Sequence, residues 1–185
     1  MKPTQVLARV DALFSERGGG EYHGEAVTQL EHALQCAWLA EKSGHSPSLI
    51  VAALLHDVGH LLQGYGVDNL DRNINDRHEE MASRFLRQAY DLEVTEPIRL
   101  HVSAKRYLAA VRSGYGELLS PASTKSLKLQ GGPMTPKEVC EFEREPYFVA
   151  AAALREYDDR AKIVGIETPS YGYFRKYLVA ELSAE

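Results

Sequence analysis

The chain has 185 residues, of which 44% are hydrophobic and 25% are charged, a balance typical of one folded domain with a sizeable core. Its formal net charge is −5 and it contains no basic stripe, which argues against partners such as nucleic acid or an anionic membrane surface. No apolar segment approaches the roughly 20 residues of a membrane span, so we expect a cytoplasmic protein.

Hydrophobic residues recur with a helical period nearly throughout the chain. A first helix is predicted at about 4–17 and a second at about 26–43. A third begins with Ser46 as N-cap and Pro47 as first helical residue, and continues through "LLHDVGH", residues 54–60. Further helices are predicted at about 77–91, from Thr95, from the capping-box pattern at Thr135, at 147–162 and near the C-terminus.

No segment shows the alternation of a strand, and the stretch 113–134 has turn chemistry at both ends without a predicted helix. The expected fold is all-α, a helical bundle that forms a single domain over 1–185. The two cysteines, Cys36 and Cys140, lie too far apart to suggest a disulfide framework or a zinc knuckle. Both fall in helical patterns, so we expect buried thiols.

Histidines recur in separate predicted helices of this bundle. They occur in "QLEHALQ", "LLHDVGH", "DRHEEM" and "RLHVSAK", and an aspartate directly follows the first histidine of "LLHDVGH". A lone histidine on an apolar helix is more often a hydrogen-bonded core residue than a ligand, but a bundle converges such side chains on its interior. Imidazole and carboxylate ligands suit iron, manganese or zinc, so ligand type alone leaves the metal open.

The order of these residues resembles the HD-domain superfamily. Its minimal pattern corresponds here to His32, His56, Asp57 and Asp158, which would bind one metal. The extra ligands of members that hold two metals are matched by His78 and His101. Because a carboxylate has two oxygens, Asp57 could bridge two cations.

Three longer stretches narrow the resemblance. They are "EYHGEAVTQLEHALQCA", "HVSAKRYL…SPASTKSLKLQGGPM" and "LREYDDRAK", and together they extend from Tyr22 to Lys162. These stretches look like the mixed-valent di-iron HD oxygenases, which include myo-inositol oxygenase and the PhnZ-type phosphonate-cleaving enzymes, and more like the latter. The resemblance implies an Fe(II)/Fe(III) pair, dioxygen as co-substrate and a helical bundle with the metal site in its interior.

The implied reaction cleaves the C–P bond of a 1-hydroxy-2-(amino or trimethylammonio)ethylphosphonate and gives glycine or glycine betaine plus inorganic phosphate. An upstream hydroxylase would supply the 1-hydroxyphosphonate. Carried over by position, the resemblance implies that iron one is held by His32, His56, Asp57 and Asp158, and iron two by Asp57, His78 and His101.

The resemblance also implies the remaining roles. Residues about 18–28 would form a lid in which Tyr22 occupies the open iron position and Glu25 meets the cationic group of the substrate. His60, one turn from His56, would touch metal-bound substrate. Donors for the phosphonate and its surroundings would be Lys105, Ser123, Ser126, Gln130, Arg155 and Lys162.

Each of these residues also fits a simpler structural role. Lys105, with Arg106 and Arg112, fits a solvated helix face, and Tyr22 fits a packing residue. Ser123 and Ser126 could cap turns, and Lys162 could pair with Asp158 or Asp159.

The histidine pattern also fits two different functions. One is a phosphohydrolase that uses metal-activated water on a phosphate ester, and the second is a non-catalytic metal-binding bundle. Within the oxygenase interpretation, the polar loop 66–77 leaves the N-substitution of the substrate open. Its Asp68 and Asp71, together with the neighbouring Tyr65, could surround a quaternary ammonium.

Overall fold

Helices make up nearly all of the regular structure in the computed structural model, which describes residues 1–22, 24–63 and 75–183. The helices are α1 (Pro3–Arg17), α2 (Gln29–Lys42), α3 (Pro47–Leu55), α4 (Val58–Gln63), α6 (His78–Leu86), α7 (Leu92–Val111), α8 (Tyr115–Leu118), α9 (Pro121–Leu129), α10 (Pro136–Phe142), α11 (Phe148–Arg160) and α12 (Tyr171–Ala180). The predicted all-α class is confirmed.

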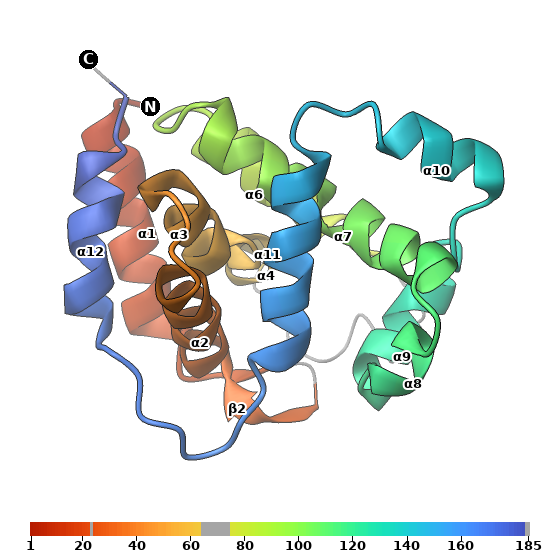
Figure 1. Ribbon diagram of the computed structural model, residues 1–185. Coiled ribbons are helices and arrows are strands. Elements are labelled where there is room, and N and C mark those ends of the chain that lie inside the picture. Colours follow the sequence, from red (N-terminus) through yellow and green to blue (C-terminus); the bar gives the residue numbers. More distant parts are fainter. Residues whose placement is uncertain (23, 64–74, 184–185) are drawn as a thin grey trace.

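The centre of the bundle is formed by α7 and α11, which pack against each other and against α3, while α2 also packs on α11 (Figure 1). On one side, α12 covers α3 and α1 contacts α4; on the other side lie α8, α9 and α10. The larger of two hydrophobic clusters among the described residues runs through α1, α2, α3, α6, α7, α11 and α12, and its largest fully buried side chains include Phe174, Leu54, Ile98 and Leu154.

Short polar residues set the helix starts that the sequence predicted. Ser46 caps α3 by accepting a hydrogen bond from the backbone N–H of Leu49, and Pro47 follows at the first helical position. Thr135 and Glu138 form the expected capping box of α10. The same device, formed by Thr28 and Glu31, starts α2, so this helix begins three residues later than predicted.

The residues just before α2 form a hairpin instead of a helical turn, which corrects the expectation of no strands. Strand β1 (Glu21–Tyr22) pairs antiparallel with β2 (Glu25–Thr28). Strands of two and four residues are too short to show an alternating pattern, and the pairing depends on Gly24, whose φ of 77° lies in the left-handed region that glycine adopts freely.

Several helix boundaries also differ from the prediction. The third predicted helix is interrupted between α3 and α4 at His56 and Asp57, and α7 begins at Leu92 because Asp91 adopts an extended N-cap conformation ahead of Thr95. The unpredicted α9 begins at Pro121 after the N-cap Ser120. Cys36 is buried as expected, whereas Cys140 is exposed because it lies on the outer face of α10.

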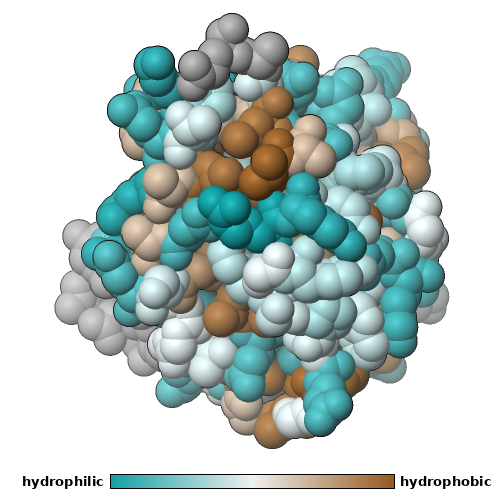
Figure 2. Space-filling view, turned by 90° about the vertical axis from the view of Figure 1, so that its left-hand side faces the viewer, coloured by the Kyte–Doolittle hydropathy of each residue, from teal (hydrophilic) through white to brown (hydrophobic). Residues whose placement is uncertain are grey.

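Within the described residues, no helix is both long enough and apolar enough to cross a membrane. The face formed by α12 and α1 is mixed in character: Figure 2 shows a hydrophobic area in its upper half among hydrophilic side chains. Across this face, Arg175 of α12 makes an ion pair with Asp11 of α1 at 2.9 Å.

Candidate metal and substrate site

Five elements bring the six predicted metal-ligand side chains together at one point in the interior. His56 and Asp57 lie in the turn between α3 and α4, and the other four come from α2, α6, α7 and α11. All six are buried, with relative exposures between 0% and 9%. The interruption of the helix at His56–Asp57 places both side chains at the centre of the bundle.

One half of the cluster surrounds the Oδ2 atom of Asp57. The Nε2 atoms of His32 and His56 lie 3.3 Å apart, and they lie 3.8 Å and 3.4 Å from Asp57 Oδ2. Asp158 adds its Oδ1 atom at 3.5 Å from His32 Nε2 and its Oδ2 atom at 3.8 Å from His56 Nε2. Ligands at about 2.1 Å from one ion lie roughly 3.0–3.4 Å apart, so these four donors are spaced almost as a metal requires.

The other half of the cluster surrounds the Oδ1 atom of Asp57. His78 Nε2 and His101 Nε2 lie 3.2 Å apart and 3.4 Å and 3.6 Å from this oxygen. Asp57 therefore presents one carboxylate oxygen to each histidine pair, as a bridging ligand would.

The hydrogen bonds made by His32 and His56 indicate that this pair of rings is arranged to bind a cation. His32 Nδ1 lies 2.8 Å from the carbonyl oxygen of Ala161, and His56 Nδ1 lies 2.9 Å from that of Ala53. A carbonyl only accepts hydrogen bonds, so each Nδ1 carries a proton, and in the neutral form of the ring the Nε2 lone pair is the group turned toward the other histidine. Two lone pairs at 3.3 Å are unfavourable unless a cation lies between them.

Burial and the local charges set the protonation of the cluster. Burial lowers the pKa of His32 to about 4, so this ring is neutral at pH 7. Burial alone would raise the pKa of Asp57, but the imidazoles around it, His56 first, hold that pKa well below its usual range. Burial alone would lower the pKa of His78, but the hydrogen bond to Asp76 and the charges of Asp57, Glu79 and Asp76 together outweigh it and raise the pKa to about 9. Without metal, His78 therefore carries the additional proton of an imidazolium at pH 7.

A wall of cationic and hydroxyl groups faces this cluster. Lys105 is 3% exposed, and its Nζ donates a 2.7 Å hydrogen bond to Ser126 Oγ. Lys162 Nζ donates to Ser123 Oγ at 2.9 Å. Burial, followed by repulsion from Arg155, lowers the pKa of Lys105 to about 7. An anion in the pocket would favour the protonated form of Lys105, and the two lysine side chains are already held in position by serine hydroxyls.

These contacts test the simpler structural roles considered for the wall residues. The solvated-face interpretation is wrong for Lys105 but holds for the exposed Arg112, which pairs with Glu156 at 2.9 Å. Ser123 and Ser126 lie within α9 and do not cap it, because Ser120 does. Lys162 contacts Ser123 instead of the predicted aspartates.

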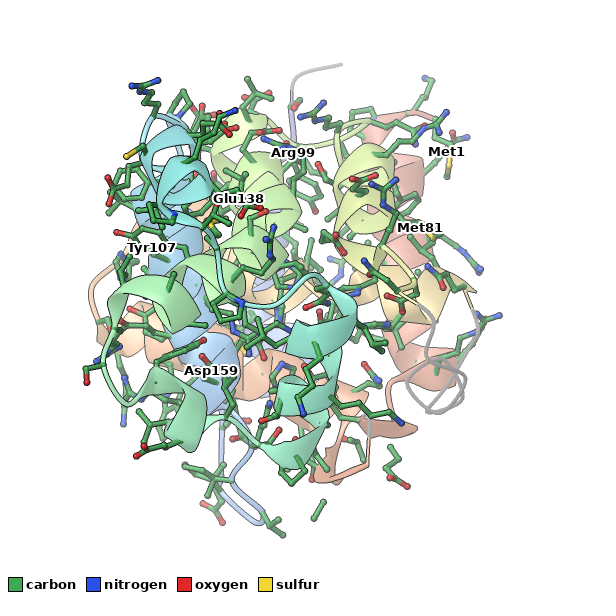
Figure 3. All side chains as sticks on the ribbon, turned by 90° about the vertical axis from the view of Figure 1, so that its right-hand side faces the viewer. Met1, Met81, Arg99, Tyr107, Glu138 and Asp159 are labelled. Atoms are coloured by element: carbon green, nitrogen blue, oxygen red, sulfur yellow. The ribbon has the colours of Figure 1, made fainter. Side chains whose placement is uncertain are left out.

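Arg155 forms ion pairs with both Asp158 and Asp159. It contacts Asp158 Oδ2 at 2.6 Å and also pairs with Asp159, which in turn accepts a hydrogen bond from the Tyr115 hydroxyl. Asp159 lies on the side of α11 that is turned toward α8 (Figure 3). Burial opposes ionisation of Asp158, but Arg155, together with His56, Lys162 and His32, outweighs it and keeps the pKa of this carboxyl well below its usual range. Arg155 therefore orients Asp158 and keeps it charged.

The β1–β2 hairpin supplies two side chains of the site, Tyr22 and Glu25. The Tyr22 hydroxyl donates to Asp57 Oδ2 at 2.7 Å, and its ring stacks on His32 with centroids 3.8 Å apart. Tyr22 is thus more than a packing residue. Glu25 Oε1 lies 3.7 Å from Lys162 Nζ, so the hairpin contacts both the metal-ligand cluster and the basic wall.

A cavity of about 640 Å³ of empty space, open to solvent at its mouth, joins these groups. Every predicted substrate contact lines it: Tyr22, Glu25, His60, Lys105, Ser123, Ser126, Gln130, Arg155 and Lys162. The buried Oε1 of Gln130 has no hydrogen-bond partner among the described residues, which leaves it available to a ligand.

Some residues of the site were missed by the sequence analysis, and some residues that it considered lie outside the described part of the chain. Asp76, Asn75 and Val102 also line the cavity, and Cys36 Sγ lies 3.6 Å from His32 Nε2. The spacing of Cys36 one helical turn after His32 was the available signal. Tyr65, Asp68 and Asp71, considered for a quaternary ammonium, lie outside the described part of the chain.

The helical fold and the buried histidine–aspartate cluster define an HD-domain protein, and comparison with known families agrees. Residues 30–140 match the family model of the HD domain, so the chain belongs to the HD-domain family.

Two curated relatives are dioxygenases. The chain is 44% identical over 169 residues to the 1-hydroxy-2-(trimethylamino)ethylphosphonate dioxygenase (glycine-betaine-forming) of Leisingera caerulea, which covers 91% of this chain and 86% of that protein. It is 44% identical over 164 residues to the hydroxymethylphosphonate dioxygenase of Gimesia maris, with 87% and 82% covered. The chain therefore belongs to the same family of HD-domain oxygenases, and the PhnZ-type resemblance is confirmed.

Proposed function

We propose that this enzyme is a di-iron oxygenase that uses dioxygen to cleave the C–P bond of a 1-hydroxy-2-(amino or trimethylammonio)ethylphosphonate, giving glycine or glycine betaine and inorganic phosphate. The observation that carries the proposal is the joining of two features in one cavity. Two histidine pairs share the bridging Asp57, and a wall of lysine and serine donors faces them.

The proposed ligands follow from the two halves of the cluster. Iron one is assigned to His32, His56, Asp57 and Asp158, and iron two to Asp57, His78 and His101. This set of imidazoles and carboxylates suits iron, and the facing Nε2 lone pairs of His32 and His56 fit a cation between them. When bound as an Fe(II)/Fe(III) pair, the iron supplies the activation of dioxygen and the one-electron chemistry at C1.

The residues of the basic wall bind and orient the phosphonate. Lys105 and Lys162 are held by Ser126 and Ser123, so their ammonium groups are already ordered before substrate enters. Preordered donors lose less conformational entropy on binding. The side-chain amide of Gln130 adds a neutral group at the same wall, and its N–H, not its Oε1, is the atom that can donate to a phosphonate oxygen.

His60 completes the environment of the hydroxyl end. Its Nδ1 lies 2.9 Å from Asp76 Oδ2 and its Nε2 lies 3.9 Å from Asp57 Oδ1. The ring thus turns Nε2 toward the place where a substrate hydroxyl would meet the metal pair. We assign His60 to holding that hydroxyl.

The hairpin is assigned as a lid. Tyr22 lies with its hydroxyl between Asp57 and Asp158, at 2.7 Å and 3.4 Å, where it would exclude water from two residues that would hold iron one. Burial, together with the charges of Asp158 and Asp57, raises the pKa of Tyr22 well above its ordinary value, so the phenol stays protonated. Substrate entry requires the hydroxyl to leave this position.

Glu25 supports a cationic substituent on the substrate. In the absence of substrate its carboxylate lies 3.7 Å from Lys162. A substrate that carries both a phosphonate and an ammonium can satisfy Lys162 with the first and Glu25 with the second. Hydroxymethylphosphonate offers no such cation, so we expect it to be the poorer substrate here.

The atoms balance for an oxygenation. A 1-hydroxyphosphonate dianion plus O₂ gives a carboxylate, a hydrogen phosphate dianion and one proton. The carbon gains one oxygen and the phosphorus gains one. A phosphohydrolase would instead consume water and leave any C–P bond intact.

The experiment that tests the proposal compares phosphate release from a panel of 1-hydroxyphosphonates with and without dioxygen. We expect release only after dioxygen is admitted, and fastest with a 2-amino or 2-trimethylammonio group. Equal release without dioxygen would contradict an oxygenase. The cytoplasmic location and the upstream hydroxylase stay predictions.

A further inference from the structure

Asp76 lies directly before α6, outside the set of residues predicted from the sequence, and its carboxylate joins two histidines of the site. Its Oδ1 lies 2.9 Å from His78 Nδ1 and its Oδ2 lies 2.9 Å from His60 Nδ1. The two rings stack with centroids 3.9 Å apart and planes inclined by 24°. One carboxylate thus hydrogen-bonds a proposed ligand of iron two and contacts a proposed substrate-binding histidine.

The other three histidines of the metal cluster are held differently. His32, His56 and His101 direct their Nδ1 atoms to the backbone carbonyls of Ala161, Ala53 and Ile98. Among the four, only His78 is oriented by an ionised side chain. A carboxylate on Nδ1 fixes the tautomer, directs Nε2 at the metal and makes the imidazole a stronger electron donor than a carbonyl does.

The backbone around Asp76 is arranged for this contact. Arg77 has φ 51° and ψ 39°, and among the described residues it is the one non-glycine residue with positive φ. This left-handed turn lets Asp76 Oδ1 accept from the backbone N–H of His78 at 3.4 Å as well as from its ring. The Gln63 side chain donates to the Asp76 carbonyl at 2.9 Å, which ties the segment to α4. Unfavourable left-handed residues persist where the surroundings require them, often at functional sites.

We propose that Asp76 is a positioning residue that holds His78 in its Nδ1–H tautomer and thereby sets the affinity of the second metal position. The inference rests on the two-metal assignment under Proposed function. It also distinguishes the two positions chemically: iron two has a carboxylate-supported imidazole, whereas the imidazoles of iron one are supported by carbonyls.

The test measures metal binding and not turnover. The full chain is stripped of metal and titrated anaerobically with Fe(II) in competition with a chromophoric chelator. Wild type should bind two equivalents. In Asp76→Ala and the isosteric Asp76→Asn, the first affinity should stay within about twofold, and the second should fall about 10- to 100-fold, which is the usual effect of removing such a supporting carboxylate. Far-UV circular dichroism and a melting curve show whether each variant folds, and Asp76→Asn keeps the shape of the side chain if Asp76→Ala does not.

Glu79→Gln is the matched control. The Glu79 carboxylate is buried and lies 3.6 Å from His78 Nδ1, beyond hydrogen-bond distance, so this variant removes a nearby negative charge without removing the support of the ring. It should bind both equivalents as wild type does.

Unchanged second affinity in both Asp76 variants, or an equal loss in Glu79→Gln, would overturn the inference. A wild type that binds one equivalent would instead refute the two-metal assignment under Proposed function, so the two failures are distinguishable.

Discussion

Gly59, between the His-Asp pair and His60, controls how closely α4 approaches the start of α6. A Cβ at this position would lie 2.1 Å from the backbone oxygen of His78 and 2.8 Å from its carbonyl carbon. The nearest neighbours are backbone atoms that cannot rotate away, so Gly59→Ala must separate the two segments by about 0.9 Å to restore a 3.0 Å contact.

The expected cost follows from that displacement. Overpacking of a closely packed interior costs about 1–3 kcal/mol, and for a chain of this size each kcal/mol lowers Tm by about 2–4 °C. We therefore expect Gly59→Ala to melt about 2–12 °C below wild type. Because His78 moves with α6, its Nε2 would also shift from its position 3.4 Å from Asp57 Oδ1, and the second metal equivalent should bind more weakly.

Differential scanning calorimetry and anaerobic Fe(II) titration measure the two effects. Gly116→Ala is the control, since a Cβ there meets nothing within 4 Å and its φ is not in the left-handed region, so this variant should be neutral or slightly more stable. If Gly59→Ala melted within about 1 °C of wild type and bound two equivalents with wild-type affinity, the role assigned to the α4–α6 contact would be refuted.

Three further predictions test separate parts of the site. His78→Ala should keep metal at the first position, measured by elemental analysis, and lose turnover; activity retained in this variant would contradict a two-iron mechanism. Glu25→Ala should raise KM for the trimethylammonio substrate about tenfold, which corresponds to the loss of about 1.4 kcal/mol of attraction between the carboxylate and the cation, with unchanged metal content; an unchanged KM would refute the role given to Glu25. Burial lowers the pKa of His32 from 6.5 to about 4, so as pH falls the unfolded chain is protonated at this residue before the folded protein is. His32 therefore lowers the free energy of unfolding of the metal-free protein between pH 6.5 and pH 4. Urea unfolding should show the free energy of unfolding falling by up to about 3 kcal/mol over this pH range in wild type, and by less in His32→Gln. Equal decreases in the two proteins would contradict the role given to His32.

The sequence predicted most of the helices because their signals are local. Ser46 and Thr135 act through hydrogen bonds within three residues, and the apolar period that identified α2 and α11 is a property of each helix alone. The polar α9 was missed, since few of its residues face the core, and the β1–β2 hairpin was missed because its strands are short.

The metal-ligand cluster was predictable for a different reason, namely that the order of its histidines and aspartates resembles a known family. The contacts between elements had no such signal. That Lys105 reaches Ser126, or that Arg155 takes both Asp158 and Asp159, depends on how α7, α9 and α11 pack. The position of Asp76 depends on a left-handed Arg77, which nothing in the residue type indicates.

The most direct test of the central claim is to follow both atoms of oxygen-18 gas into the products of a 1-hydroxy-2-(amino or trimethylammonio)ethylphosphonate. If the enzyme is a C–P-cleaving dioxygenase, mass spectrometry should find one labelled oxygen in the carboxylate product and one in the phosphate. Phosphate formed at the same rate under nitrogen, with its new oxygen derived from labelled water, would contradict the account.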